Sequence, residues 1–252
     1  MIINGKYENY PLPGDYWLAA EGVFETLRTY ENRAFAVNRH LDRLELGIRE
    51  LGLVAPDRNE VEESITKLLA MEKFPNGRLR IVIAGDATWT ITHQEYRPSQ
   101  AGLNCSVIRR SVLPELKSPG FKRTQYRSRL QIQQDALDNG FDDALLVSGD
   151  GYFIEGTVCN LIFEIDGSWV TPDLSSGCLP GVTRELLIEN FGVREAKIAL
   201  GDLDRVKSVA FTSSLREIQA IKAIDGQFFA ETESLKRFQD IFHSWILGNL
   251  SL

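Results

Sequence analysis

The spacing of hydrophobic residues near the start of the chain predicts a hairpin followed by a helix. Two β-prone runs, 24–30 and 34–37, flank the polar stretch Glu31-Asn32-Arg33, which favours a tight turn. Asn38 stands where a helix N-cap is expected. The residues after it repeat at the spacing of an amphipathic helix: Leu41, Leu44, Ile48 and Leu51. Strands and a one-sided helix are therefore expected to pack together here.

The rest of the chain continues to mix the two spacings. Helices are predicted over 59–71, 127–138, 183–190 and 231–247, and strands over 79–83, 144–147, 152–154 and 161–165. Short turns at 148–151 and 166–167 favour antiparallel pairing. The expected fold class is α+β, with mostly antiparallel sheets flanked by helices.

A stretch without periodicity divides the chain. Residues 111–120 contain two prolines and a glycine, which is typical of a connection between domains. We therefore expect an N-terminal α+β domain over 1–112, a linker over 113–121 and a C-terminal α+β domain over 122–252.

Composition and charge exclude several classes of protein. The 252 residues carry 28 Lys and Arg against 35 Asp and Glu, for a net charge of -7, and no basic run suited to nucleic acid. No apolar run approaches the roughly 20 residues that a membrane helix needs. The N-terminus lacks the pattern of a secretory signal. Three cysteines without paired spacing predict free thiols in a reducing compartment, so we expect a cytoplasmic protein without a metal site.

Two features suggest a small-molecule site. Gly181-Val182-Thr183-Arg184 opens a predicted helix, whose free N–H groups and dipole would suit an anion, although ordinary helix initiation explains the same residues. Glu155 lies beside strand residues, either at a surface bend or as a functional carboxylate. The residues alone leave both alternatives open.

Six segments together resemble the class IV (fold-type IV) pyridoxal-phosphate enzymes, which include branched-chain aminotransferases, D-amino acid aminotransferases and aminodeoxychorismate lyases. The resemblance covers nearly the whole chain and rests on residues 21–28, 40–44, 121–126, 140–147, 154–161 and 178–184, in the family's order and spacing. It implies a two-domain fold like that of D-amino acid aminotransferase. It also implies pyridoxal 5'-phosphate as cofactor, a small-molecule amino substrate and a homodimer.

The resemblance assigns the central chemical roles to particular residues. Lys122 matches the lysine that forms the internal Schiff base and then carries protons. Glu155 matches the carboxylate that pairs with the pyridine nitrogen. Arg43 matches the arginine that binds the cofactor phosphate. Tyr126 would hydrogen-bond the ring oxygen of the cofactor.

Further positions complete the implied phosphate site. Val182 and Thr183 would supply backbone N–H groups, with the Thr183 hydroxyl. Ser214 would add a second hydroxyl. Arg80, on the predicted strand 79–83, is interpreted as an anchor for the substrate carboxylate.

The reaction is less determined than the cofactor. Residues 177–184 and 214–216 are similar to those of aminodeoxychorismate lyases, which release pyruvate to form 4-aminobenzoate for folate biosynthesis. Departures at 84–91, at Ala20-Glu21 and at 219–221 affect segments near the substrate. We therefore expect a 4-amino-4-deoxychorismate lyase-like enzyme, with an amino-acid aminotransferase of the branched-chain or D-amino acid type as the alternative. A catalytically silent cofactor-binding protein is the third hypothesis.

Overall fold

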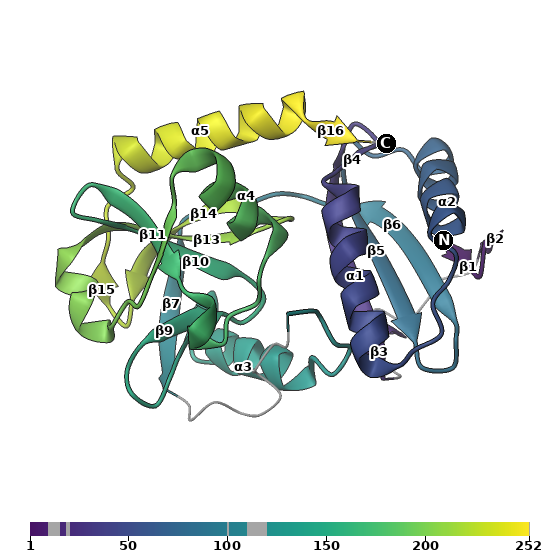
Figure 1. Ribbon diagram of the computed structural model, residues 1–252. Helices are drawn as coiled ribbons and strands as arrows, with labels where there is room; N and C mark the ends of the chain where they lie inside the picture. Colours follow the sequence, from purple (N-terminus) through teal and green to yellow (C-terminus); the bar gives the residue numbers. More distant parts are fainter. Residues whose placement is uncertain (10–15, 19–20, 100, 110–119, 252) are drawn as a thin grey trace. The chain divides into compact units, whose positions relative to one another are not determined.

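The computed structural model describes residues 1–9, 16–18, 21–99, 101–109 and 120–251 (Figure 1). The chain divides into two compact units. Unit 1 comprises Met1–Pro98, Gly120–Tyr126 and Trp245–Leu252, and unit 2 comprises Ser99–Pro119 and Arg127–Ser244. No helix in the described parts is long and apolar enough to cross a membrane.

Unit 1 contains a seven-stranded sheet in the order β16-β4-β3-β5-β6-β1-β2, and every pair in it is antiparallel. Its strands are β1 Ile2–Ile3, β2 Lys6–Tyr7, β3 Gly22–Tyr30, β4 Arg33–Phe35, β5 Asn76–Ala84, β6 Trp89–Glu95 and β16 Leu250–Ser251. The helices are α1 Val37–Leu51, α2 Arg58–Met71 and the short 3-10 helix η1 Tyr16–Leu18.

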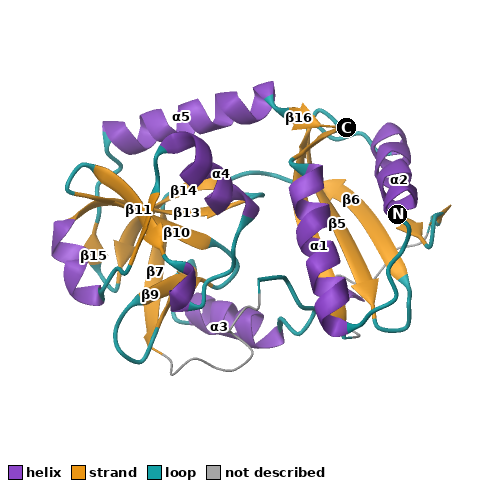
Figure 2. Ribbon diagram, viewed as in Figure 1, coloured by secondary structure: helices purple, strands orange, loops and turns teal. Residues whose placement is uncertain are grey.

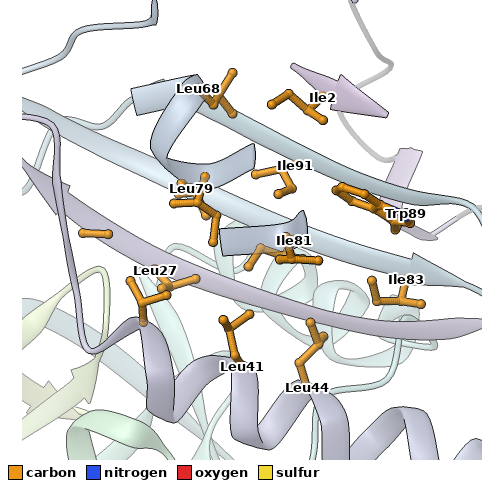
Figure 3. Close-up of a cluster of buried hydrophobic side chains, with 14 of the residues drawn as sticks. Ile2, Leu27, Leu41, Leu44, Leu68, Leu79, Ile81, Ile83, Trp89 and Ile91 are labelled. Carbon is orange, nitrogen blue, oxygen red and sulfur yellow. The ribbon is translucent and has the colours of Figure 1, made fainter. Parts of the chain in front are cut away.

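The core of unit 1 lies between this sheet and its two α-helices. Figure 3 shows Leu41 and Leu44 of α1 next to Leu27 of β3, and Leu68 of α2 above the strands. Strand alternation sends every second residue to this core, so the residues between them, Phe24 and Thr26 of β3 and Arg80 of β5, belong to the opposite face. That second face carries aromatic and charged groups.

The predicted hairpin is present, but the helix after it begins differently. Glu31 and Asn32 form the turn with φ of 48° and 64°, the left-handed conformation of a tight hairpin turn. The prediction of Asn38 as N-cap is wrong: the cap is Ala36, with φ 54° and no side-chain hydrogen bond. The chain reverses directly after β4, which points Val37 into the core, and Asn38 instead accepts from Arg58.

Unit 2 is built on a nine-stranded sheet in the order β12-β11-β10-β13-β14-β7-β8-β9, with β15 on β14 (Figure 2). The strands are β7 Leu103–Arg109, β8 Asp143–Val147, β9 Phe153–Gly156, β10 Asn160–Ile165, β11 Ser168–Pro172, β12 Arg194–Ala196, β13 Val206–Ser213, β14 Glu217–Ile224 and β15 Gln227–Phe228. Three pairs are parallel, namely β7 with β8, β7 with β14, and β11 with β12. The other pairs are antiparallel, as predicted.

The helices of unit 2 are α3 Arg127–Asp138 and α4 Val182–Phe191, with 3-10 helices η3 Leu174–Ser176 and η4 Leu200–Arg205. The helix α5 Glu233–Gly248 belongs to unit 2 as far as Ser244, and its last residues belong to unit 1. Ile132 and Ala136 of α3 pack with Leu146 of β8 and Ile154 of β9. The packing of α3 on β8 and β9 therefore fixes the position of β9, the strand that carries Glu155.

The two units differ in extent from the domains expected from the sequence. Residues 120–126, including Lys122, group with unit 1, although the sequence-based boundary assigns Lys122 to a domain over 122–252. The grouping follows from backbone hydrogen bonds between this segment and β3. Most of the expected linker, residues 113–119, lies outside the described residues.

Candidate active site

The segment that contains Lys122 is attached to the start of β3. The Phe24 N–H donates to the Lys122 carbonyl at 3.1 Å, and the Thr124 N–H donates to the Gly22 carbonyl at 2.9 Å. An antiparallel bridge joins Val23 and Arg123 between these bonds. The backbone of Lys122 is thus held by the regular geometry of a strand edge.

The Lys122 side chain lies against an aromatic cluster formed by Trp17, Phe24 and Tyr126. Its Nζ is 5.3 Å from the centre of the Phe24 ring and 5.8 Å from that of Tyr126. The Phe24 and Tyr126 rings meet edge to face at 5.3 Å, and Trp17 lies 4.6 Å from Phe24. A ring face attracts a cation, so the aromatic cluster holds the ammonium group without a counter-charge from the cluster itself.

Arg80 contacts the same aromatic cluster from β5. Its guanidinium carbon lies 4.5 Å from the Trp17 ring centre and 5.8 Å from that of Phe24, while Nε donates to Thr26 at 3.3 Å. Within the described residues, no acidic side chain forms an ion pair with it. Burial, reinforced by the charge of Arg78, lowers the pKa of Arg80 to about 10, so the group remains a cation at neutral pH.

Arg43 lies in a buried charged network on the core-facing side of β3. Its Nε and Nη2 donate to the two oxygens of Glu25 at 2.7 and 2.9 Å, and His40 Nδ1 contacts Glu25 at 2.7 Å. Burial acts to raise the pKa of Glu25, but the charges and hydrogen bonds of Arg43 and His40 prevail and hold that pKa far below its ordinary value. The carboxylate is therefore ionised.

In His40, the effects that lower the pKa prevail over those that raise it. Burial lowers its pKa, and repulsion from Arg43 and Lys122 adds to this effect, against the attraction of Glu25. The ring is therefore neutral at pH 7 and donates its Nδ1 proton to Glu25. The network fixes one edge of the Arg43 guanidinium.

In unit 2, Glu155 is the next-to-last residue of β9. Its buried carboxylate accepts hydrogen bonds from three donors. Arg129 Nη2 donates to Oε1 at 2.6 Å, and the Leu179 N–H and Asn160 Nδ2 donate to Oε2 at 3.1 and 3.3 Å. A surface bend, one of the two alternatives open from the sequence, is excluded because only 3% of Glu155 is exposed.

The start of α4 is held next to this carboxylate. Gly181 is the N-cap, and Val182 and Thr183 form the buried first turn. Asn160 Nδ2 also donates to the Leu179 carbonyl at 2.9 Å, and a Cβ on Gly181 would lie 2.0 Å from Asn160 Oδ1. Asn160 therefore joins Glu155 to the chain that leads into the helix N-terminus.

A buried hydroxyl without a hydrogen-bond partner lies on the strand beside Asn160. Thr212 of β13 is directly opposite Asn160 in the sheet, 1% exposed, and its Oγ1 has no partner among the described residues. Ser214 follows two residues later, just past the end of β13. An unpaired buried hydroxyl is costly in the absence of a polar ligand, so this part of unit 2 is suited to bind one.

The predicted site residues thus form two groups. In unit 1, Lys122, Tyr126 and Arg80 share the aromatic cluster, while Arg43 is fixed by Glu25. In unit 2, Glu155, Val182 and Thr183 are connected through Asn160. Sequence reasoning missed four contributors: Phe24, Glu25, Arg129 and Asn160. Phe24 and Glu25 lie inside the family-like segment 21–28, and Asn160 lies inside 154–161, so the resemblance was the signal that could have found these three. Arg129 lies outside the family-like segments. In the described ranges, no cluster of His, Cys, Asp and Glu is suited to a metal ion.

Comparison with known proteins identifies the class. In fold, the chain is similar to the branched-chain amino acid aminotransferase of Escherichia coli, with a TM-score of 0.85 and 21% identity over 99% of this chain and 97% of that one. It is equally similar to a putative 4-amino-4-deoxychorismate lyase of Legionella pneumophila, with a TM-score of 0.83 and 20% identity over 94% and 96%. The fold is therefore that of the fold-type IV enzymes, an α+β fold of two domains.

The sequence comparisons identify the family. The sequence model of amino-transferase class IV matches residues 22–224, so the chain belongs to the class IV aminotransferase family. A probable branched-chain-amino-acid aminotransferase of Rickettsia bellii is 28% identical over 250 residues, which cover 88% of this chain and 86% of the relative. The aminodeoxychorismate lyase of Bacillus subtilis is 29% identical over 219 residues, covering 75% and 73%. The protein is a pyridoxal-phosphate-dependent enzyme of this family.

Proposed function

We propose that this protein is a 4-amino-4-deoxychorismate lyase-like enzyme, which eliminates pyruvate and forms 4-aminobenzoate. The observation that carries the proposal is the position of Arg80. A partly buried guanidinium stacked on Trp17 and Phe24, with no acidic partner in the described chain, suits a carboxylate attached to a flat ring. Lys122 contacts the same Phe24 ring.

The residues present fit pyridoxal phosphate. Glu155 is a buried carboxylate with acceptor capacity beyond its three donors, since two carboxylate oxygens offer about four lone-pair sites. The backbone N–H groups of Val182 and Thr183 at the start of α4 suit a phosphate. The hydroxyl of Thr212, buried without a partner in the described chain, adds a polar group on the neighbouring strand.

When bound, pyridoxal phosphate supplies an aldehyde that condenses with amines and a ring that accepts electrons released at the amino-bearing carbon. Lys122 would hold the cofactor, and its amine, once free, would take the proton from that carbon of the substrate. As the adjacent C–O bond breaks, its electron pair stays on the leaving enolpyruvate, which takes up a proton and becomes pyruvate. Arg80 orients the substrate carboxylate.

Other residues hold the cofactor in place. Glu155 keeps a proton on the ring nitrogen, and Tyr126 donates to the ring oxygen. Val182, Thr183 and Ser214 bind the phosphate, with Arg43 positioned by Glu25. These roles are proposed residue by residue from the resemblance, and the buried, hydrogen-bonded state of Glu155 and Arg43 supports them.

An amino-acid aminotransferase is the second candidate. Relatives named as branched-chain aminotransferases match most of this chain, and Lys122 would carry protons in either reaction. The two candidates differ in their co-substrate. Elimination needs no keto acid, whereas transamination without one stops after the first half-reaction, with the amino group on the cofactor.

The deciding experiment is a substrate panel on the purified, cofactor-loaded enzyme. Pyruvate released from aminodeoxychorismate without an added keto acid is the expected result, and Lys122→Ala should abolish it. Turnover of amino acids that depends on an acceptor keto acid would favour the aminotransferase. A yellow protein that converts neither substrate class would support the silent cofactor-binding alternative.

We further propose a cytoplasmic homodimer. Three free, buried cysteines, Cys105, Cys159 and Cys178, are consistent with a reducing compartment. Light scattering on the purified protein measures the mass of the assembly directly, and the mass of a monomer would contradict the proposed homodimer.

A further inference from the structure

Arg129 is the charged group that contacts Glu155. It lies on α3, is 7% exposed, and donates to Glu155 Oε1 at 2.6 Å, the shortest of the three hydrogen bonds to this carboxylate. The same guanidinium donates through Nη1 to the carbonyls of Thr157 and Gly156 at 3.3 and 3.5 Å. Arg129 therefore holds both the carboxylate and the backbone that follows it.

The other donors to Glu155 are neutral. Asn160 and the Leu179 N–H share Oε2, so they orient the carboxylate without adding charge. Among the described residues of unit 2, the remaining titratable group facing Glu155 is Cys178. Burial raises the pKa of this thiol, and the charge of Glu155 raises it further, so the thiol stays neutral. Among these groups, Arg129 is therefore the one that places a positive charge next to the Glu155 carboxylate.

A carboxylate that hydrogen-bonds a protonated ring nitrogen can take the proton itself, which leaves two neutral groups. An adjacent cation opposes this transfer because it attracts the carboxylate anion at 2.6 Å more strongly than it repels a proton beyond it. The charge on Arg129 therefore favours the arrangement with the proton on the ring.

We propose that Arg129 is a positioning residue that holds Glu155 in place and supplies the cation beside it, so that the shared proton stays on the ring nitrogen of the cofactor. The proposal rests on the proposed role of Glu155. It predicts that the electron-accepting strength of the cofactor depends on a residue that need not touch cofactor or substrate.

The test is the ring-nitrogen resonance of the enzyme loaded with 15N-labelled pyridoxal phosphate, recorded for Arg129→Gln and Arg129→Lys. Arg129→Gln removes the charge, and the ratio of protonated to unprotonated ring nitrogen should fall about tenfold, as for a one-unit change in relative proton affinity. Arg129→Lys keeps the charge and should retain the signal of the unaltered enzyme. Arg205→Gln, at an exposed arginine paired with Asp166, serves as the charge-matched control.

In kinetics, kcat should fall in Arg129→Gln because a smaller share of the cofactor carries the ring proton, while KM changes little because substrate contacts are intact. An unchanged nitrogen signal in Arg129→Gln, or an equal change in Arg129→Lys, would overturn the proposal. If Arg129→Gln does not fold, Arg129→Lys and Glu155→Gln decide between the outcomes. Failure of the proposed function is distinguishable, since the unaltered enzyme would then show no Lys122-attached cofactor or no response to Glu155→Gln.

Discussion

His40 donates a hydrogen bond to Glu25 at 2.7 Å, and both side chains are fully buried. The pair belongs to the network that fixes Arg43. Because the histidine is neutral and the carboxylate ionised, the arrangement depends on pH in a way that can be measured.

The stability of the cofactor-free protein should fall on mild acidification because of His40. Its folded pKa is lowered, so below the unfolded value near 6.5 the unfolded chain binds more protons and gains relative stability. At pH 5.5 this effect is at most about 1.4 kcal/mol. Thermal unfolding of His40→Asn, which keeps a donor, should lose that part of the pH dependence.

Equal slopes for His40→Asn and the unaltered protein would show that His40 is not held neutral.

Arg80→Leu should weaken substrate binding selectively. A charged hydrogen bond contributes about 1.5–3 kcal/mol, so KM for a carboxylate substrate should rise about 10- to 100-fold. The stability of the cofactor-free protein should be equal or higher, since a partly buried cation without an acidic partner in the described residues is removed. Arg78→Leu, on the same strand, is the matched control, and equal effects on KM would contradict a specific role for Arg80.

Gly181→Ala should disturb the start of α4. A Cβ there would lie 2.0 Å from Asn160 Oδ1, and Asn160 is tied to Glu155 and Leu179. The expected cost is about 1–3 kcal/mol of stability, accompanied by weaker cofactor binding. Gly201→Ala, with open space around its Cβ, should change neither quantity; a similar loss in both variants would contradict this geometry.

Thr212→Val tests whether the buried hydroxyl lacks a protein partner. Removing an unpaired hydroxyl should leave the melting temperature of the cofactor-free protein unchanged or higher. Thr171→Val is the comparison, because Thr171 donates to the Leu161 carbonyl at 2.7 Å, and its loss should cost about 1 kcal/mol. A drop for Thr212→Val as large as that for Thr171→Val would reveal a partner.

Local interactions explain which elements were predictable. The helix over 127–138 is observed at those residues because its hydrophobic spacing and its packing on β8 agree. A strand over 152–154 was also expected next to Glu155, and the observed β9, Phe153–Gly156, includes that residue. The N-cap at Asn38 was not realised, because burial of Val37 and the reversal after β4 outweighed the local preference of an asparagine.

The sequence by itself determined the family and the cofactor, and it predicted Lys122 as the cofactor lysine, because six ordered segments carry those signals in residue type and spacing. Only the tertiary structure decided which side chains meet. Three of these contacts connect residues that are separated along the chain. The bridge beside Lys122 joins its segment to β3, Arg43 and His40 both contact Glu25, and Arg129 contacts Glu155. Such contacts depend on strand register and helix packing. The ionised state of Glu25 follows from its contacts with Arg43 and His40, and the neutral state of His40 follows from its burial, neither of which a linear pattern states.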